Sequence, residues 1–591
     1  MARTAEGEAS PVDGHSDTTT SDPAAEAAPT EGGLTLRLLL RESLPIWVVA
    51  FVVYTLTLSS VPALTHDSLT YLNAMHDGGI GLWHPHHLVY NAIGAEWLRF
   101  VRSLGVVSDG LKIVAWVNSA LGATSAVLCY LLLRDRAQAG RLLALAGTLG
   151  AAGSFGFWFY SVSVEVYLLP LTLLLAATYV LLSPRLGTRY VVAVGLLTGL
   201  AVLGHQVNVM FGAVVVVVLA GKARTVGRAT VGRWLAAWAA TASAVVVVAY
   251  GLVMWLAVKP QSAAEANSWF TRYAGTDTFW VPPGPSTLPR AAFGASRAIV
   301  GGHFLFRFGW FRDRAASAVP GKSLTDEAFL VRNLPIGVAA LLTITALVGG
   351  GLLVLALARG LARRGDVPAR ARSLLVALAA WVVTYSLFFL VWEPTNVEFW
   401  IPQVTCVWLA AAALCARRPE ADTDARPGRQ RPWPKLLLAA AVLVGVTNFA
   451  GSILPAVDSA NDIYAYRFRA LGRVVGVGDA VVVDRPYLST GYNTRNTGAG
   501  AIPAEPYSEA VGPIDPADSF SPEAVVFQVQ TVLDGGHRVA VEPELIDNPA
   551  SDEAEQAGDL LEQVYGDRWY RVEPAPGVQW LVIDPPAFGG P

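Results

Sequence analysis

The chain has 591 residues, of which 53% are hydrophobic and only 15% are charged, and its formal net charge at pH 7 is −3. A typical soluble domain carries about 25% charged residues, so this chain is short of ionic surface for its size. The composition excludes a disordered protein and a basic nucleic-acid-binding protein. It indicates a membrane protein with its polar residues concentrated in loops. The three cysteines lie in apolar runs, so we expect neither a disulfide framework nor a thiolate metal cluster.

The N-terminal segment, residues 1–33, is rich in Ala, Asp, Glu, Ser, Thr, Pro and Gly. Such a segment buries too little apolar surface to offset the entropy lost on ordering, so it is predicted to be a disordered tail. It is acidic where a signal peptide would be basic. We therefore expect no cleavage, and we expect the first apolar helix to remain as an anchor.

Residues 34–455 form the predicted transmembrane domain. A helix needs about 20 apolar residues to cross the hydrocarbon core. On this basis the sequence predicts about eleven membrane-spanning helices, near 44–64, 111–133, 141–158, 164–183, 190–204, 206–221, 234–257, 334–358, 373–392, 397–416 and 436–454. The stretch 190–221 is interrupted by polar residues at 205–208, so two short helices meeting at a polar turn are expected there.

Arginine-rich segments predict the orientation of the chain. If the tail is cytoplasmic, the short basic loops that fall inside are 134–141, 184–189, 221–233, 358–372 and 416–435. This agrees with the positive-inside rule. The long loops 65–110 and 258–333 and the region after 455 then lie outside. We expect a multi-pass protein of the cell membrane with an extracytoplasmic C-terminal region.

The pattern changes in the C-terminal region, residues 456–591. Short β-branched runs at 479–484, 537–543, 569–574 and 578–585 alternate with helix-like stretches at 521–534 and 551–565. This alternation is typical of a small α/β domain. The intervening segment 485–520 is rich in Gly, Pro, Asn and Ser and is predicted to be a long loop.

On this topology, ionisable residues from distant loops gather at the outer membrane face. They are Asp67, His84, His86, His87, Glu165, His205, Arg297, His303, Glu393 and Glu398. Aromatic residues at the same level are explained by an interfacial belt. Carboxylates gain nothing from a bilayer boundary, so Asp67, Glu165 and Glu398 need another explanation.

The ordered set of motifs around these residues resembles the GT-C superfamily of multi-spanning glycosyltransferases, which includes the protein O-mannosyltransferases. The motifs are an Asp directly after the first span, HPHHLVYN, FWFYSVSVEVY, GHQVN and WEPTNVEFWIP. The resemblance covers roughly residues 40–455. Many members carry a paired acidic motif in the first loop, whereas here Asp67 lies between His66 and Ser68.

The resemblance implies a polyprenyl-phosphate-linked sugar donor, an acceptor hydroxyl on a glycan, lipid or protein, and inversion at the anomeric carbon. Attack by that hydroxyl requires a base near its proton, and Asp67 is the candidate. The departing phosphate gathers negative charge, which Arg297, His303 and His205 are predicted to stabilise. His84, His86, His87, Glu165 and Glu398 complete the predicted substrate-binding set. Membrane lipids are the other expected partner.

Structural roles compete with these functional ones at two positions in the first outer loop. Asp67 has the residue type of an N-cap for a helix beginning at Ser68. The cluster His84–His87 contains a common zinc-ligand type, but Pro85 intervenes and no acidic ligand is adjacent. Substrate hydrogen bonding, a divalent cation and a loop-structuring role therefore stay open for these histidines, and no metal ligand is assigned.

The remaining candidates have structural alternatives as well. Glu165 could cap the fourth span, and His205 could satisfy backbone groups freed by the helix break. Arg297 could contact lipid headgroups. Glu398 stands where a helix begins, and a carboxylate there is favoured by the helix dipole.

Two other functions compete with the enzyme. A transporter or flippase of lipid-linked saccharides should carry charges along a path through the membrane. The predicted spans are nearly free of charge and the candidate residues gather on one side, which favours the enzyme. A non-catalytic GT-C-like protein, with the C-terminal domain as a binding module, is the third alternative.

Overall fold

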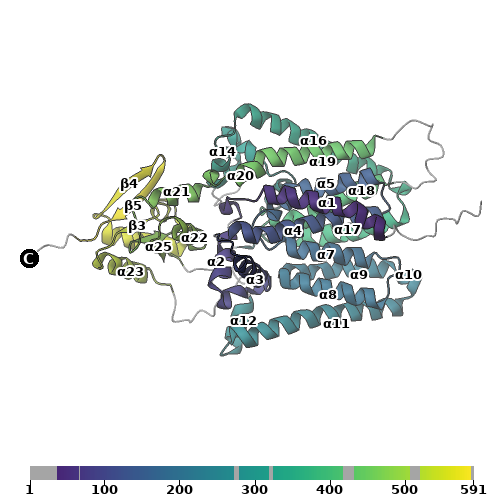
Figure 1. The fold of residues 1–591 in the computed structure, drawn as a ribbon, viewed down its shortest axis with the longest axis horizontal. Coiled ribbons are helices and arrows are strands. Elements are labelled where there is room, and N and C mark those ends of the chain that lie inside the picture. The colour runs from purple at the N-terminus through teal and green to yellow at the C-terminus, as the bar shows by residue number, and fades with distance from the viewer. Residues whose placement is uncertain are drawn as a thin grey trace, which may run out of the picture.

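The computed structural model describes residues 36–65, 67–108, 110–271, 279–318, 324–416, 432–505 and 520–586. The predicted tail 1–33 lies outside these residues. A bundle of long helices occupies one end of the molecule and a domain containing a β-sheet occupies the other (Figure 1). Short helices from the long loops, among them α2 and α3, lie between the two parts (Figure 1).

The bundle is built from apolar helices in the regions where the sequence predicts them. They are α1 (Leu36–Leu56), α4 (Leu111–Leu131), α5 (Arg141–Gly153), α6 (Phe155–Ser161), α7 (Leu168–Leu181), α8 (Thr188–Gly204), α9 (Phe211–Gly221), α11 (Arg228–Val253), α16 (Ile336–Ala362), α17 (Ala369–Phe389), α18 (Ile401–Cys415) and α19 (Trp433–Asn448).

The predicted count of eleven spans is not confirmed. Among the described residues, six helices are long and apolar enough to cross a membrane, or seven if the bent pair α5–α6 is one span. The helices α7 and α8 and the segment Gln206–Gly221 are apolar but shorter.

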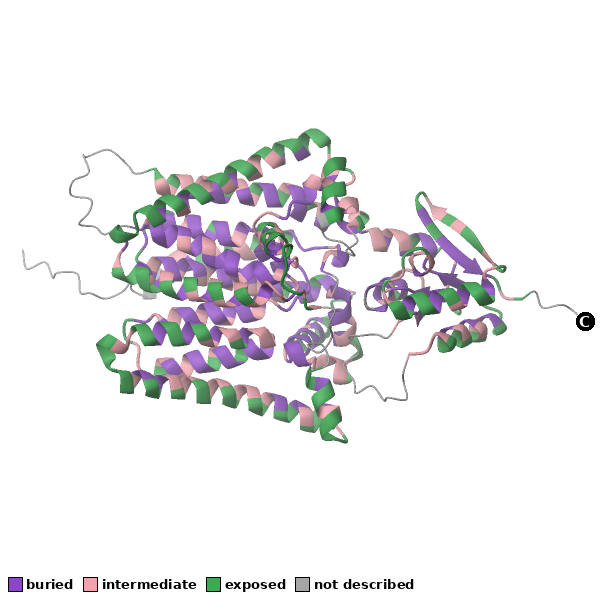
Figure 2. Ribbon diagram, turned by 180° about the vertical axis from the view of Figure 1, so that it is seen from behind, coloured by how far each residue is buried: buried purple, intermediate pink, exposed green. Residues whose placement is uncertain are grey.

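The surface of the bundle is apolar, as expected for a protein surrounded by lipid. Only 17% of the apolar window of Arg228–Val258 and 22% of that of Ile336–Ala362 is buried inside the protein. Figure 2 shows the exposed faces of these outer helices and the buried interior between them. Exposed apolar faces of this length require a non-aqueous environment.

The first predicted span, 44–64, is wrong at its C-terminal end. Helix α1 ends at Leu56, and a 3₁₀ turn at Pro62–Leu64 follows a non-helical stretch. Here the amides of Ser59 and Ser60 donate to the carbonyls of Val162 and Ala456, at 2.9 and 2.8 Å. These bonds replace the helical ones and hold two distant loops beside the start of the first long loop.

The polar break predicted at 205–208 is confirmed. Helix α8 ends at Gly204 and a 3₁₀ segment, Gln206–Met210, leads into α9. The side-chain amide of Asn208 donates to the carbonyl of His205 (2.8 Å) and accepts from the Tyr385 hydroxyl (3.0 Å). The backbone freed by the break is thus partly satisfied by side chains.

The described parts of the two long loops contain six short α-helices. They are α2 (Ser68–Asp77), α3 (Tyr90–Ser103), α12 (Ala263–Thr271), α13 (Thr287–Ile299), α14 (Gly309–Ala318) and α15 (Thr325–Leu330). Helix α2 begins directly after Asp67. Helices α2 and α3 pack against each other and against α4 of the bundle.

The C-terminal region contains a five-stranded mixed sheet in the order β2-β1-β3-β5-β4. Strands β1 (Ala480–Val483), β2 (Gly500–Pro503) and β3 (Val539–Val541) are parallel, and β5 (Val578–Ile583) runs antiparallel to β3 and β4 (Trp569–Ala575). The α/β pattern predicted from the β-branched runs is therefore present.

The predicted loop 485–520 is wrong in its first part. It contains the helix α22 (Pro486–Asn496) as well as strand β2. Neither has the apolar periodicity of an isolated element, because PYLSTGYNTRN is mostly polar and GAIP is an edge strand. Residues 506–519 of that prediction lie outside the described residues.

The two faces of the sheet belong to different cores. Residues Val482, Val539 and Leu581 pack with α23 (Pro522–Asp534) and α25 (Asp552–Tyr565). On the other face, Val481 and Trp580 join α21 (Ile463–Leu471) and α22 in the core that runs through the bundle. The C-terminal domain is therefore continuous with the membrane domain rather than tethered to it.

Candidate active site

A cavity of about 570 Å³ is lined in part by α2. Helix α2 lies at the end of the bundle that faces the C-terminal domain (Figure 1). The walls of the cavity come from α2, the loop 78–91, the start of α7, the break at 205–210 and the segment 388–399. Its polar and aromatic lining residues are Asp67, Thr70, Tyr71, Asn73, Asp77, His84, His86, His87, Asn91, Tyr167, His205, Gln206, Trp280, Phe388, Phe389, Trp392 and Phe399.

Asp67 occupies the N-cap position of α2 but does not use its side chain as a cap. Its Oδ2 accepts a hydrogen bond of 3.2 Å from the Tyr71 hydroxyl, one turn further along the same helix. The carboxylate lines the cavity. Asp67 therefore stands at the cap position of α2, but its carboxylate faces the cavity and does not cap the helix.

Two further predicted carboxylates lie beside Asp67. Glu165 is fully buried, and the charges of Asp67 and Glu398 are close enough to act on it. The Tyr160 hydroxyl donates to Oε2 of Glu398 at 2.6 Å. Among the described residues, no hydrogen bond of standard geometry reaches either carboxylate oxygen of Glu165, although the Val166 amide and the Thr65 hydroxyl are near enough to act on its charge. A buried carboxylate in that condition is costly unless a function retains it.

The loop that carries Glu165 is held in place through its backbone. The side-chain amide of Asn118 donates to the carbonyls of Ser163 (2.8 Å) and Glu165 (2.6 Å). The N-cap of α7 is Tyr167, and Glu165 lies two residues before it. The alternative in which Glu165 caps the fourth span is therefore not what the geometry shows.

Four imidazoles form one wall of the cavity. The rings of His84 and His87 stack at a centroid separation of 4.3 Å, and His86 lies 6.5 Å from His205. His205 stacks in turn on Tyr167 at 5.4 Å. Burial, followed by the neighbouring histidines, lowers the pKa of His84 to about 3, and burial lowers the pKa of His86 to about 4. Both rings are therefore neutral near pH 7 and can donate one hydrogen bond and accept another.

His205 combines both of the roles considered for it. Its Nδ1 accepts from the backbone amide of Val207 at 3.4 Å, which caps the 3₁₀ segment after the helix break. The same ring lines the cavity. A backbone role and a substrate contact are compatible here because they use different parts of the ring.

Arg297 and His303 lie elsewhere. Neither is among the described residues that line the cavity. Arg297 forms a buried ion pair with Glu327 (Nη1–Oε1 3.0 Å) and contacts His303 at 3.3 Å. Nδ1 of His303 lies 2.9 Å from the Ser452 hydroxyl. The structure thus brings Asp67 and four histidines together in the cavity lining. Glu165 and Glu398 lie near Asp67 but are not among the described lining residues, and the predicted cationic pair lies in a separate polar cluster.

The described residues contain no group of three or more His, Cys, Asp or Glu side chains arranged to hold a metal ion. In the part of the chain that the structure covers, all three cysteines are free, and Cys129 and Cys406 are buried in the bundle.

Aromatic residues complete the site, and the sequence did not single them out. Tyr71 lies four residues after Asp67, and Tyr167 lies two residues after Glu165. Trp280 and Trp392 form an edge-to-face pair at 4.9 Å and are joined by an isolated β-bridge. The spacing of the tyrosines from the acids was a usable signal. The tryptophan pair was not predictable, because its members come from segments far apart in sequence.

The helical bundle with its C-terminal α/β domain has counterparts among solved structures. Two similar structures are of ArnT from Cupriavidus metallidurans. The one bound to undecaprenyl phosphate has a TM-score of 0.52 and 10% identity, and the match covers 94% of this chain and 99% of that one. The apo structure has a TM-score of 0.51 and 11% identity, covering 91% and 97%. These matches show that the chain shares the fold of the ArnT structures over most of its length.

No protein-family model matches the sequence, and no curated protein sequence matches it either.

Proposed function

We propose that this chain is an inverting glycosyltransferase that moves a sugar from a polyprenyl-phosphate donor to an acceptor hydroxyl. The observation that carries this proposal is the juxtaposition in one cavity of Asp67, four neutral imidazoles and aromatic walls, beside the buried Glu165. The ArnT structure with the same fold was solved with undecaprenyl phosphate bound, which supports a donor of that class.

Asp67 is the proposed general base. It accepts the proton of the acceptor hydroxyl, and the hydroxyl oxygen then forms a bond to the anomeric carbon of the donor. The bond from that carbon to the phosphate oxygen breaks, and the polyprenyl phosphate leaves with the electron pair. The hydrogen bond from Tyr71 orients the carboxylate on the cavity wall. Because attack and departure occur on opposite faces of the sugar, the configuration inverts.

The imidazole wall is the proposed binding surface for the polar part of the donor. His84, His86, His87 and His205 line one side of the cavity, and their ring nitrogens offer donors and acceptors for phosphate oxygens and sugar hydroxyls. Glu165 and Glu398 do not line this cavity, and their proposed role is to act on Asp67 through their charges. Arg297 and His303 are left out of this proposal because their side chains already bond to Glu327 and Ser452.

We place the reaction at the outer face of the cell membrane. The cavity lies at the end of the bundle next to the C-terminal domain, and α10 (Ala223–Val226), within the basic segment 221–233, lies at the opposite end (Figure 1). Basic loops remain on the cytoplasmic side of most membrane proteins. On this orientation the N-terminal tail is cytoplasmic and the C-terminal domain extracytoplasmic.

The test is to incubate the purified chain in lipid nanodiscs with radiolabelled polyprenyl-phosphate sugars and candidate acceptors. We expect transfer to an acceptor, or slow hydrolysis to free sugar when no acceptor is added. In liposomes, the same donors report movement across the bilayer. Intact donors together with saccharide moved across the bilayer would indicate a flippase instead of an enzyme. Donors that bind but are neither cleaved nor moved would indicate a non-catalytic binding protein.

A further inference from the structure

Helix α2 has two functional faces. Thr70, Tyr71, Asn73, Ala74 and Asp77 recur at helical spacing and line the cavity. Leu69 and Leu72 point the other way and are buried in the core that the bundle shares with the C-terminal domain. Because Asp67 is the residue at which this helix begins, the packing of its rear face fixes where the Asp67 carboxylate lies.

Besides α3 and α4, helix α22 of the C-terminal domain packs on α2, beside Leu69 and at the edge of the cavity face. A Cβ atom at Gly491 would lie 3.1 Å from both Cβ and Cδ1 of Leu69 and 3.3 Å from Nδ2 of Asn73. These separations are shorter than ordinary van der Waals contact. Glycine is unfavourable in the interior of a helix, so its presence in the middle of α22 is explained by the close approach of the two helices.

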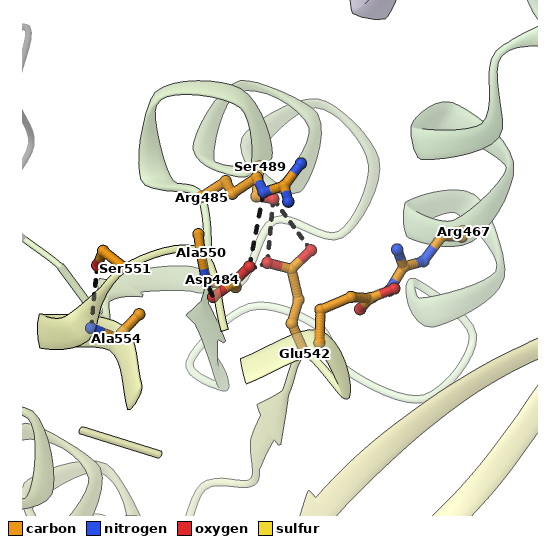
Figure 3. Close-up of polar contacts among 9 residues, drawn as sticks. Arg467, Asp484, Arg485, Ser489, Glu542, Ala550, Ser551 and Ala554 are labelled. Atoms are coloured by element: carbon orange, nitrogen blue, oxygen red, sulfur yellow. Dashed lines mark hydrogen bonds and ion pairs between the residues drawn. The ribbon is translucent and has the colours of Figure 1, made fainter. Parts of the chain in front are cut away.

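Helix α22 is itself held rigidly in the C-terminal domain. The Tyr492 hydroxyl donates to Oδ2 of Asp462 at 2.5 Å, and Asp462 caps α21 through the amide of Ala465 at 2.9 Å. The Ser489 hydroxyl donates to the buried carboxylate of Glu542, which lies directly after strand β3 (Figure 3). The helix is thus fixed to α21 by one residue and to the sheet by another.

We propose that α22 is a positioning element of the candidate active site and that Gly491 is its positioning residue. The C-terminal domain then serves as the support for α2, so that the position of Asp67 depends on a contact made far away in the sequence. This proposal rests on the proposed function for its effect on catalysis. Its structural part, the coupling of α22 to α2, can be measured without any substrate.

The test compares Gly491→Ala and Gly491→Val with Gly476→Val in the full-length chain. Gly476 is in the same domain, has no positive φ, and a Cβ added there meets nothing within 4 Å. Hydrogen exchange is measured over residues 68–77 and over α23 and α25, together with kcat and KM for sugar transfer. We expect Gly491→Val to speed exchange in α2 at least tenfold and to lower kcat at least tenfold, with smaller changes for Gly491→Ala.

Exchange in α23 and α25 should stay within twofold of the wild type for Gly491→Ala, which separates a local displacement from unfolding of the domain. Replacing Leu69 by Ala in the Gly491→Val chain removes the Cδ1 contact and should restore part of kcat. Because a small displacement of a catalytic group lowers the rate steeply, kcat should change more than KM.

Unchanged exchange in α2 and unchanged kcat for both Gly491 variants would overturn the proposal. So would an equal effect of Gly476→Val. If the wild-type chain transfers no sugar while exchange in α2 responds to Gly491 as expected, the proposed function fails and the coupling of the two helices stands.

Discussion

The C-terminal domain and the cavity end of the bundle both bury carboxylates, but the hydrogen bonding of these carboxylates differs. Glu542 accepts from the amide of Asp484 at 2.7 Å and from the Ser489 hydroxyl at 3.0 Å (Figure 3). In the bundle, Glu165 is as deeply buried, yet among the described residues no hydrogen bond of standard geometry reaches its carboxylate oxygens, and two other carboxylates act on it.

We interpret Glu542 as a carboxylate that stabilises the fold and Glu165 as one that is retained for the function of the site. Satisfied buried polar groups define one arrangement of the chain, whereas unsatisfied ones cost stability and persist where a function needs them. The buried pair of Arg297 and Glu327 resembles the C-terminal domain in this respect, although it lies on the membrane side of the molecule. The following predictions test the division, beginning with the largest expected effect.

Asp67→Asn should lower the rate of sugar transfer by about 10⁴-fold, which corresponds to roughly 5.5 kcal/mol of transition-state stabilisation. The amide keeps the shape and the contact with Tyr71 but cannot take the acceptor proton. Transfer rates in nanodiscs measure the effect, and Asp77→Asn is the matched control because Asp77 lines the same cavity from the same helix. A comparable loss for both variants would assign the effect to cavity charge and remove Asp67 as the base.

Arg297→Met should destabilise the chain by about 4 kcal/mol, because it leaves the Glu327 carboxylate buried without its cation. Reversible unfolding in mixed micelles measures the loss. The double variant Arg297→Met with Glu327→Leu should recover most of it. If stability is unchanged and the donor KM rises instead, Arg297 binds phosphate as the sequence first suggested.

Stability should also depend on pH through Glu542. Burial raises the pKa of Glu542 to about 7, so between about pH 4.5 and 7 the folded chain holds a proton that the unfolded chain has lost. Stability from this group is therefore fully present below about pH 4.5 and is lost as the pH rises to about 7, by on the order of 3 kcal/mol, and the loss levels off above that pH. Thermal unfolding from pH 5 to 8 should show this slope in the wild type and not in Glu542→Gln. The exposed control Glu553→Gln should retain it.

The histidine wall carries the smallest expected effect. His84→Asn and His86→Asn should each raise the donor KM about tenfold with a smaller change in kcat, since each removes a cavity-lining ring nitrogen that we propose to bind the donor. His303→Asn should change KM less than twofold because His303 lies outside the cavity wall. Steady-state kinetics with a labelled donor distinguish the cavity histidines from His303. An equal rise in KM for His303→Asn would show that His303 also contributes to donor binding.

The sequence predicted those parts of the molecule that depend on local pattern. Apolar runs located the bundle helices, and β-branched runs located strands β1, β3, β4 and β5. Helix α22 was missed because its polar sequence becomes helical through contacts with α21, the sheet and α2. The end of the first span was misplaced because the backbone of Ser59 and Ser60 bonds to distant loops instead of continuing the helix.

The candidate site could be predicted where a charged residue falls close to a predicted membrane boundary. Asp67, Glu165 and Glu398 stood out because carboxylates near a bilayer boundary need a reason. Arg297 seemed equally suitable, but its partner Glu327 lies 30 residues away and could not be paired with it from sequence. The tryptophans of the cavity were attributed to an interfacial belt, since composition alone does not separate a belt residue from a lining residue.

The packing of α22 on α2 has a consequence for biosynthesis. The wall that bears Asp67 is made early in translation, but the helix that supports it emerges from the ribosome only after every apolar helix of the bundle. A nascent chain that has inserted its whole bundle still lacks this support. The candidate site therefore matures as one of the last events of assembly, which would keep an incomplete polypeptide from consuming lipid-linked sugar.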